Sequence, residues 1–233
     1  MKKSLDELKI DYNNKKVEML WIYMNFLIKE NKKYNLTNIT DESEIITKHF
    51  LDSLAPLSQL RRDIFNKVLD MGTGAGFPGM VWKIFMPEKS FLLVDSTLKK
   101  VKFLKLLSAK LEIYDNLEIK HARAEKLGKD PEYRGKYDLV LSRAVAPLNI
   151  LAEYTVPFAS NDSLLIYYKG PDYEKEIKNS KKAFNLLKAE YQDKLELNVP
   201  GLEAERFLVI YKKINNTTKK YPGRNGRPKK RAL

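Results

Sequence analysis

A glycine-rich segment is the first part of the chain whose residue types and spacing could do chemistry. The strand-like run KVLDM, residues 67–71, leads directly into GTGAGFPG, residues 72–79, and a helical pattern follows. Closely spaced glycines after a first strand let a ligand approach the backbone, as nucleotide-linked cofactors require. A dinucleotide site has the spacing G-x-G-x-x-G, whereas here the third glycine comes one residue earlier. Asp70 adds a negative charge before the glycines, which favours a ligand with a cationic centre, such as S-adenosylmethionine, over a pyrophosphate.

Polar residues also follow the next three strand-like runs. Asp95 ends the second run, where an acid of a doubly wound sheet hydrogen-bonds ribose hydroxyls. Ala124 and Glu125 follow the third run and would lie beside an adenine, although Glu125 is also compatible with a solvated loop acid. Arg143 follows the fourth run and either points into the ligand crevice or forms a surface salt bridge. The glycines alone are compatible with a tight turn, but the whole order of elements favours a cofactor site.

Strand-like runs alternate with helical patterns from residue 67 to residue 188. This alternation predicts βαβ units, and therefore an α/β fold with a mostly parallel sheet covered by helices on both faces. Two more runs, separated by Pro200-Gly201, are expected to pair antiparallel. The predicted strands are 67–71, 90–95, 117–120, 137–142, 163–169, 191–199 and 206–213. The predicted helices contain the apolar stripe 17–28 and the segments 41–54, 78–86, 98–112, 147–160 and 173–188.

Composition excludes several classes of protein. The chain has 233 residues, of which 43% are hydrophobic and 31% charged, which is sufficient for one large domain with an appendage. It contains no cysteine, which excludes a disulfide scaffold, a thiolate zinc site and a cysteine nucleophile. His49 and His121 are its two histidines, so no metal site is expected. The charged N-terminus does not resemble a signal peptide, and no apolar run would span a bilayer, so we expect a cytoplasmic protein.

The net charge of +13 points to a polyanionic partner. Nucleic acid and an anionic membrane are both compatible with it, as is a lysine-rich surface without a partner. The C-terminal segment favours nucleic acid, because glycines and prolines oppose the amphipathic helix that a membrane anchor needs. A frayed terminus is the simpler alternative. The basic residues of this segment are Lys219, Lys220, Arg224, Arg227, Lys229, Lys230 and Arg231.

The nucleophile of a methyl transfer can be narrowed by elimination. Methylation of a pyrimidine carbon needs a covalent cysteine, which the chain lacks. Enzymes that methylate exocyclic amines usually carry an Asn/Asp-Pro-Pro-aromatic loop after the fourth strand, where this chain has SRAVAP, residues 142–147. A purine ring nitrogen with a free lone pair requires neither device. His49 and Asp52 share a helix face, which either docks on the sheet or shapes a substrate pocket.

At these residues the chain resembles a known family. The segment DMGTGAGFPG, residues 70–79, is similar to the cofactor loop of the bacterial 16S rRNA guanine-N7 methyltransferases, the glucose-inhibited division protein B family. Further similar stretches occur in the same order, and the resemblance extends from about residue 17 to the end. They are YNLT (34–37), His49 with Asp52-Ser53, LVDS (93–96), RAE (123–125), SRA (142–144), Lys169-Gly170, RFLV (206–209) and Tyr221-Pro222.

The resemblance implies a Rossmann-like class I methyltransferase with a seven-stranded sheet whose last strand is antiparallel. It implies S-adenosylmethionine as the cofactor and a guanine in the decoding-centre loop of 16S rRNA as the target, with no general base assigned. The three parts would be an N-terminal helical region (1–62), the methyltransferase core (63–214) and a basic tail (215–233). The expected cofactor-binding residues are Gly72, Gly74, Gly76, Phe77, Asp95, Ala124, Glu125 and Arg143. The expected RNA-binding residues are Arg123, Lys169, Lys219, Lys220, Arg224, Arg227, Lys229 and Lys230.

Two departures from the family pattern lie in the tail. Gly223 follows Tyr221-Pro222 where the family usually has an arginine, and Ala232 stands before the last residue where the family has a proline. Two other classes of function stay open, an NAD-linked oxidoreductase and a non-catalytic RNA-binding factor for ribosome assembly. The sequence is compatible with either free 16S rRNA or the small ribosomal subunit as partner. We expect a monomer without membrane contact.

Overall fold

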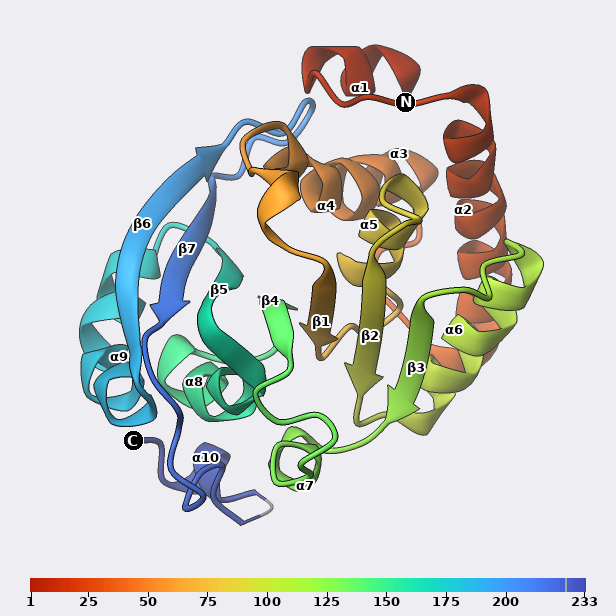
Figure 1. The fold of residues 1–233 in the computed structure, drawn as a ribbon. Coiled ribbons are helices and arrows are strands. Elements are labelled where there is room, and N and C mark those ends of the chain that lie inside the picture. Colours follow the sequence, from red (N-terminus) through yellow and green to blue (C-terminus); the bar gives the residue numbers. More distant parts are fainter. Residues whose placement is uncertain (225) are drawn as a thin grey trace.

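The centre of the molecule is a seven-stranded sheet with the strand order β3-β2-β1-β4-β5-β7-β6 (Figure 1). The computed structural model describes residues 1–224 and 226–233, except for the side chain of Lys229. Strand β7 pairs antiparallel with both β5 and β6, and the other four strand pairs are parallel. This confirms the predicted fold class. The strands are β1 (Lys67–Met71), β2 (Ser90–Asp95), β3 (Leu117–His121), β4 (Tyr137–Arg143), β5 (Ala159–Lys169), β6 (Ala189–Leu197) and β7 (Arg206–Lys213).

Helices cover both faces of this sheet and bury one hydrophobic core on each face. Neighbouring strand residues point to opposite faces, so Val68 and Leu69 of β1 belong to different cores. One core joins the sheet to α2, α5 and α6, and the other joins it to α7, α8 and α9. The α-helices are α1 (Lys2–Glu7), α2 (Asn14–Tyr34), α3 (Glu42–Ile45), α4 (Asp52–Leu54), α5 (Gly79–Phe85), α6 (Leu98–Lys110), α7 (Ala124–Leu127), α8 (Leu148–Thr155), α9 (Tyr173–Leu187) and α10 (Arg227–Lys230). The π-helix η1 (Ile46–Leu51) and the 3-10 helices η2 (Ala55–Ser58), η3 (Arg62–Ile64) and η4 (Val156–Phe158) complete the set.

The predicted bounds are correct for β1, β2 and β7, most other elements differ by one to four residues at an end, and two predicted helices change character along their length. The predicted helix 147–160 stops at Thr155, continues as the short η4 and gives way to β5 at Ala159. Pro157 explains the change, because it has no N–H for the helical ladder. The predicted helix 41–54 is capped as expected, since the Asp41 side chain accepts from the Glu44 N–H at 3.0 Å. Its middle is the π-helix η1, which the apolar spacing did not indicate.

The helices before β1 pack directly on the sheet. Leu20 and Met24 of α2 and Phe50 of η1 belong to the same buried core as Met80 of α5 and Leu104 of α6. Trp82 of α5 is fully buried and donates from its indole nitrogen to the Ser53 carbonyl at 2.6 Å. Within the described residues, none of the helices has the length and apolar character needed to cross a membrane.

The C-terminal segment is docked on the body of the protein. The Arg134 guanidinium donates to the carbonyls of Thr217, Thr218 and Tyr221 at 2.7, 3.0 and 2.8 Å. Farther along, the Gly223 N–H donates to Glu153 Oε2 at 2.8 Å. Near its end the segment forms the one-turn helix α10 beside α8, although its glycines and prolines oppose a longer helix. Pro228 permits this turn because it lies in the first helical turn, where its missing N–H has no partner to lose.

We expect Arg134→Ala to release this segment. The change removes several hydrogen bonds from a charged donor, each of which contributes about 1.5–3 kcal/mol. Trypsin should then cleave after Lys219 and Lys220 faster than in the unaltered protein, and the melting temperature should fall. Limited proteolysis followed by mass spectrometry measures this, with the exposed Arg62→Ala as the control. Equal cleavage rates in the two variants would contradict the assigned role of Arg134.

Lys213 at the end of β7 anchors the same region from inside the protein. It is 1% exposed, and its Nζ donates to the carbonyls of Leu187 and Val156 at 3.0 and 3.2 Å and to the Thr217 hydroxyl. Burial and, to a smaller extent, the charge of nearby Arg134 lower the pKa of this ammonium from 10.5 to about 7.

Lys213 should therefore make stability depend on pH. Between about pH 7 and the unfolded pKa near 10.5, the unfolded chain holds a proton that the folded chain releases, so stability rises with pH. We expect the free energy of unfolding to rise more steeply from pH 7 to 9 in the unaltered protein than in Lys213→Met. Urea denaturation at several pH values measures the two slopes. Equal slopes of the free energy of unfolding against pH in the two proteins would show that Lys213 does not titrate between pH 7 and 9.

Candidate functional site

The turn from β1 into α5 is built on a buried acid. Asp70 is fully buried, and its Oδ2 accepts from the Gly79 N–H, the first residue of α5, at 2.8 Å. Burial raises the pKa of this carboxyl to about 6, while the Thr73 hydroxyl and the Gly79 amide act in the opposite direction. Asp70 thus lies beneath the glycine loop and organises it. That its negative charge favours a cationic ligand stays a prediction.

The three glycines of the loop serve different purposes. A Cβ atom on Gly72 would lie 2.4 Å from Val145 Cγ2, and one on Gly76 would lie 2.4 Å from the Tyr23 hydroxyl. Both glycines are therefore required by the packing of the protein itself. Gly74 also has a positive φ of +62°, but a Cβ there would find its nearest neighbour, Lys100 Nζ, 3.9 Å away. Gly74 is the loop position at which an added side chain would enter open space.

Asp95 faces this loop from the end of β2. One carboxylate oxygen accepts from the Gly74 N–H at 2.9 Å and the other from the Thr97 N–H at 2.7 Å. Beside it lies a cleft of about 100 Å³. Five predicted site residues line this cleft, so the fold brings them together as expected. The ligand that they bind stays a proposal. The lining residues are Met71, Gly72, Val94, Asp95, Ser96, Ala122, Arg123, Ala124, Glu125, Val145 and Tyr154.

The C-terminal segment reaches the same cleft. Glu125 is 4% exposed, and its Oε1 accepts from the Gly226 N–H at 2.8 Å. Glu125 is therefore a buried, hydrogen-bonded acid, which contradicts the alternative of a solvated loop acid. The adjacent Tyr154 is also buried, and burial together with Glu125 and Glu153 raises its pKa to about 12. The cleft wall is thus both acidic and apolar.

Phe77 and Arg143 form a second cluster and do not line the cleft. The Phe77 ring lies between Tyr23 and His49, with centroid distances of 5.3 and 4.3 Å and near-parallel planes. The Arg143 guanidinium lies over the same ring at 5.4 Å. The loop that begins at the cleft therefore ends inside the N-terminal helices. Arg143 was expected at the cleft because strand ends converge at one edge, and Phe77 was expected there from the family resemblance.

Asp52 holds two arginines in this second cluster. Its Oδ2 accepts from Arg143 at 2.7 Å, and its Oδ1 lies 3.5 Å from Arg206 Nε. His49 Nδ1 is 3.3 Å from Arg143, and burial together with that arginine lowers the His49 pKa to about 3. One carboxylate therefore faces two guanidinium groups and a neutral imidazole, so the cluster carries a positive surplus. Arg206 could not be assigned a role from the sequence, since its partner precedes it by more than a hundred residues.

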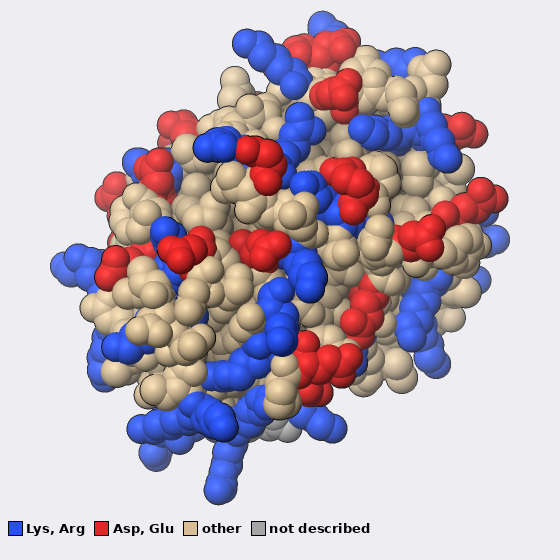
Figure 2. Space-filling model, in the orientation of Figure 1, with Lys and Arg blue, Asp and Glu red and all other residues tan. Residues whose placement is uncertain are grey.

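The predicted RNA-binding residues fall into two groups. Lys169 is held inside the protein, where its Nζ donates to Glu176 at 2.7 Å and to the Ala146 carbonyl at 3.0 Å. Figure 2 shows lysines and arginines gathered over the part of the surface where Figure 1 places α10. The side chain of Lys229 lies outside the described residues. The exposed members are Arg123, Lys219, Lys220, Arg224, Arg227 and Lys230.

A metal does not explain either cluster. Among the residues that the structure describes, no group of three or more His, Asp or Glu side chains is arranged to hold an ion. The acidic groups of the cleft accept hydrogen bonds from backbone amides instead.

Solved structures with this arrangement of sheet and helices include methyltransferases. A chain in the Haloferax volcanii complex between the Trm112 methyltransferase activator and a methyltransferase matches with a TM-score of 0.57 and 9% identity, over 76% of this chain and 94% of that one. A Klebsiella pneumoniae structure described as an O-methyltransferase matches with a TM-score of 0.55 and 10% identity, over 83% and 90%. At these identities the matches support the Rossmann-like methyltransferase fold alone.

Sequence relatives are far more similar, and three of them carry the name ribosomal RNA small subunit methyltransferase G. The Thermoanaerobacter pseudethanolicus protein is 45% identical over 89% of this chain and 86% of its own length. The Lactobacillus helveticus protein is 41% identical over 94% and 92%, and the Alkaliphilus metalliredigens protein 37% identical over 100% and 97%. The family model described as rRNA small subunit methyltransferase G matches residues 16–206. The chain therefore belongs to the rRNA small subunit methyltransferase G family, as its resemblance to the guanine-N7 methyltransferases indicated.

Proposed function

We propose that this protein transfers a methyl group from S-adenosylmethionine to N7 of a guanine in the decoding-centre loop of 16S rRNA. Membership of the rRNA small subunit methyltransferase G family is the observation that carries the proposal. The cleft beside Gly74 and Asp95 supplies a site of suitable chemistry. The NAD-linked alternative loses support, because the glycine spacing and the family both favour a methyl donor.

The cleft residues suit S-adenosylmethionine. Asp95 would accept from the ribose hydroxyls, as an acid at this strand end does in doubly wound sheets. A carboxylate has about four acceptor positions, so its two amide contacts leave capacity for this. Met71, Val94 and Tyr154 offer apolar surface for the adenine, with Ala124 and Glu125 at its edge. The open approach at Gly74 would admit the amino-acid part of the cofactor.

The remaining predicted residues would act around the cofactor. Gly72 and Gly76 shape the loop through packing, and Phe77 fixes its far end between two aromatic rings. Arg143 would face the substrate with the positive surplus of the second cluster. The complete proposed cofactor set is Gly72, Gly74, Gly76, Phe77, Asp95, Ala124, Glu125 and Arg143.

Methyl transfer to guanine N7 requires no proton transfer by the protein. S-adenosylmethionine supplies a methyl group already activated by a sulfonium centre. Guanine N7 carries a lone pair and no proton, so the chain needs no general base. Its task is to hold the nucleophile in line with the methyl carbon and to exclude water. His49, whose pKa near 3 keeps it neutral, and Arg143 would contact the target base.

We further propose 16S rRNA, free or in the small ribosomal subunit, as the partner. The exposed basic residues Arg123, Lys219, Lys220, Arg224, Arg227 and Lys230 would contact its phosphates, together with Lys229. The protein would act as a cytoplasmic monomer. Its parts would be the N-terminal helical region (1–62), the methyltransferase core (63–214) and the basic segment (215–233).

Gly74→Asn should abolish cofactor binding while leaving the fold intact. Asparagine tolerates a positive φ, and the nearest atom to the new Cβ is 3.9 Å away, so the unfolding temperature should change little. The added side chain would occupy the space in which the cofactor approaches the loop. Isothermal titration with S-adenosylmethionine should show affinity reduced by more than tenfold. Unchanged affinity would place the cofactor elsewhere.

Methyl transfer itself tests the proposed target. Labelled S-adenosylmethionine is incubated with unmethylated small ribosomal subunits, naked 16S rRNA or total tRNA. We expect label in 16S rRNA that is released as 7-methylguanine, and none with Gly74→Asn. Label in tRNA alone would overturn the target, and bound cofactor without transfer to any RNA would favour the non-catalytic assembly factor.

A further inference from the structure

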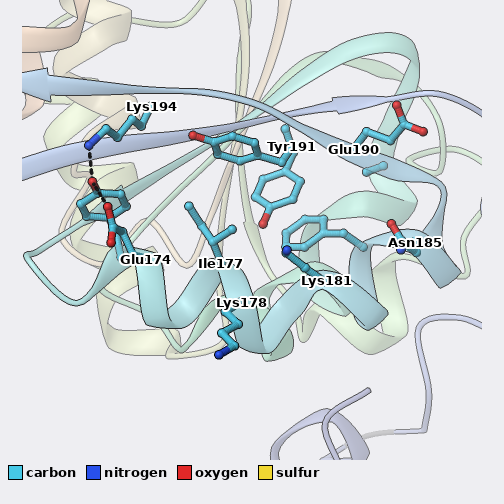
Figure 3. Close-up of a pocket in the computed structure, with 12 residues that line it drawn as sticks. Glu174, Ile177, Lys178, Lys181, Asn185, Glu190, Tyr191 and Lys194 are labelled. Atoms are coloured by element: carbon cyan, nitrogen blue, oxygen red, sulfur yellow. Dashed lines mark hydrogen bonds between the residues drawn. The ribbon is translucent and has the colours of Figure 1, made fainter.

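A groove between α9 and β6 lies outside both clusters of the proposed active site. It encloses about 600 Å³ at the β6 edge of the sheet. Its floor is aromatic, because the buried rings of Phe184 and Tyr211 stack with their planes at 13°. Tyr191 stands on its rim, edge-on to Tyr211 at 5.9 Å, and is 43% exposed (Figure 3). The groove thus presents an accessible aromatic ring held in place by a rigid base.

A β-bulge determines which charged residue of β6 faces this groove. Tyr191 pairs with Tyr211, and the next pair is Asp193 with Ile210, so Gln192 is an extra residue in β6. Regular alternation would place Asp193 on the same face as Tyr191. The extra residue shifts the alternation, so Lys194 lines the groove and Asp193 does not. Bulges commonly redirect a side chain in this way.

Lysines border the aromatic ring along the length of the groove. Lys178 and Lys181 of α9 are exposed and line the groove opposite β6. Lys194 donates to the Tyr173 hydroxyl and lies 4.8 Å from the centre of that ring. The two lining acids are Glu174, which accepts from the Tyr173 hydroxyl at 2.9 Å, and Glu190 (Figure 3). Three cations against two acids leave a positive surplus beside the exposed ring.

Helix α9, which forms one wall of the groove, is anchored near the proposed active edge. Helix α9 begins four residues after β5 ends, and its Glu176 accepts from Lys169 at 2.7 Å and from the Leu148 N–H at 2.8 Å. Those contacts tie the first turns of α9 to the end of β5 and to the start of α8, which follows Arg143 by five residues. An RNA strand that leaves the active edge on this side would therefore meet the beginning of the groove.

We propose that the groove between α9 and β6 binds an unpaired nucleotide of the substrate RNA, whose base stacks on Tyr191 and whose phosphates lie against Lys178 and Lys181. Exposed aromatic rings next to cations are the usual means of holding single-stranded RNA. The inference rests on the proposed function for the identity of the RNA. The binding surface itself follows from the groove, the bulge and its charges.

Variants of the intact protein test the stacking contact. Tyr191→Ala should raise the KM for 16S rRNA about tenfold, within the range that stacking of one base contributes. The kcat and the affinity for S-adenosylmethionine should stay unchanged, and Tyr191→Phe, which keeps the ring, should behave as the unaltered protein. A loss of cofactor affinity or of melting temperature in Tyr191→Ala would indicate a structural role and overturn the proposal.

The phosphate contacts are tested through the salt dependence of RNA binding. Lys178→Gln with Lys181→Gln should lower the slope of log Kd against log salt by about 1.4, or about 0.7 for each phosphate contact with single-stranded RNA. The matched control is Lys102→Gln with Lys105→Gln, two exposed lysines of α6 on the opposite face of the sheet. If the two double variants have equal salt slopes, the effect comes from net charge alone, and this result would overturn the proposal.

Direct binding separates failure of this inference from failure of the proposed function. Filter binding and photocrosslinking with 4-thiouridine-substituted 16S rRNA need no methyl transfer. A crosslink on the peptide that contains Tyr191 supports the groove even if no RNA is methylated. Methylation of 16S rRNA without a crosslink on this peptide would overturn the proposed role of the groove and leave the proposed function unaffected. The same conclusion would follow if Tyr191→Ala lost binding to the small ribosomal subunit but still bound naked rRNA.

Discussion

The hydrogen bond between the Asp70 carboxylate and the Gly79 N–H is the constraint on which the site depends. It joins the end of β1 to the start of α5 at 2.8 Å and closes the turn between them. A Cβ on Gly79 would lie 2.4 Å from Leu93 and 2.7 Å from the carboxylate itself, so no other residue fits. The contact holds the buried Asp70 carboxylate beneath the glycine loop, so the chain turns away from the sheet between β1 and α5.

From this turn the loop connects two places with different chemistry. Gly74 at its beginning borders the cleft with Asp95, and Phe77 at its end is enclosed by Tyr23 and His49. The N-terminal helices are consequently part of the site and not a separate appendage to it. Asp52 strengthens this connection, because its two oxygens face arginines at the end of β4 and the start of β7. A charge buried to this degree stays stable only while it is paired.

The fold was predictable because it follows from local patterns. Apolar runs of four to seven residues between amphipathic segments predict a parallel sheet, and the acid at Asp95 marks its carboxyl edge. What distinguishes Gly74 from Gly72 and Gly76 was not predictable, since it depends on Val145 and Tyr23, which are remote in sequence. The pairing of Asp52 with Arg206, the π-helix η1 and the docking of the C-terminal segment on Arg134 are tertiary effects as well. Motif spacing identifies residues that converge, but not which atoms they then meet.

The separation of charge at the carboxyl edge would let one edge serve the two proposed ligands, which have opposite charges. Asp95, Glu125 and Glu153 gather their carboxylates near the cleft, where a cationic sulfonium cofactor is favoured. At the neighbouring cluster, the two positive charges of Arg143 and Arg206 face the single negative charge of Asp52. The C-terminal segment adds further exposed basic residues, and both places favour a polyanion. Because the cleft acids are almost fully buried, water screens them less than it screens the exposed bases. The acids would therefore act strongly on a cofactor bound in the cleft, while the exposed bases of the C-terminal segment would attract RNA from a distance.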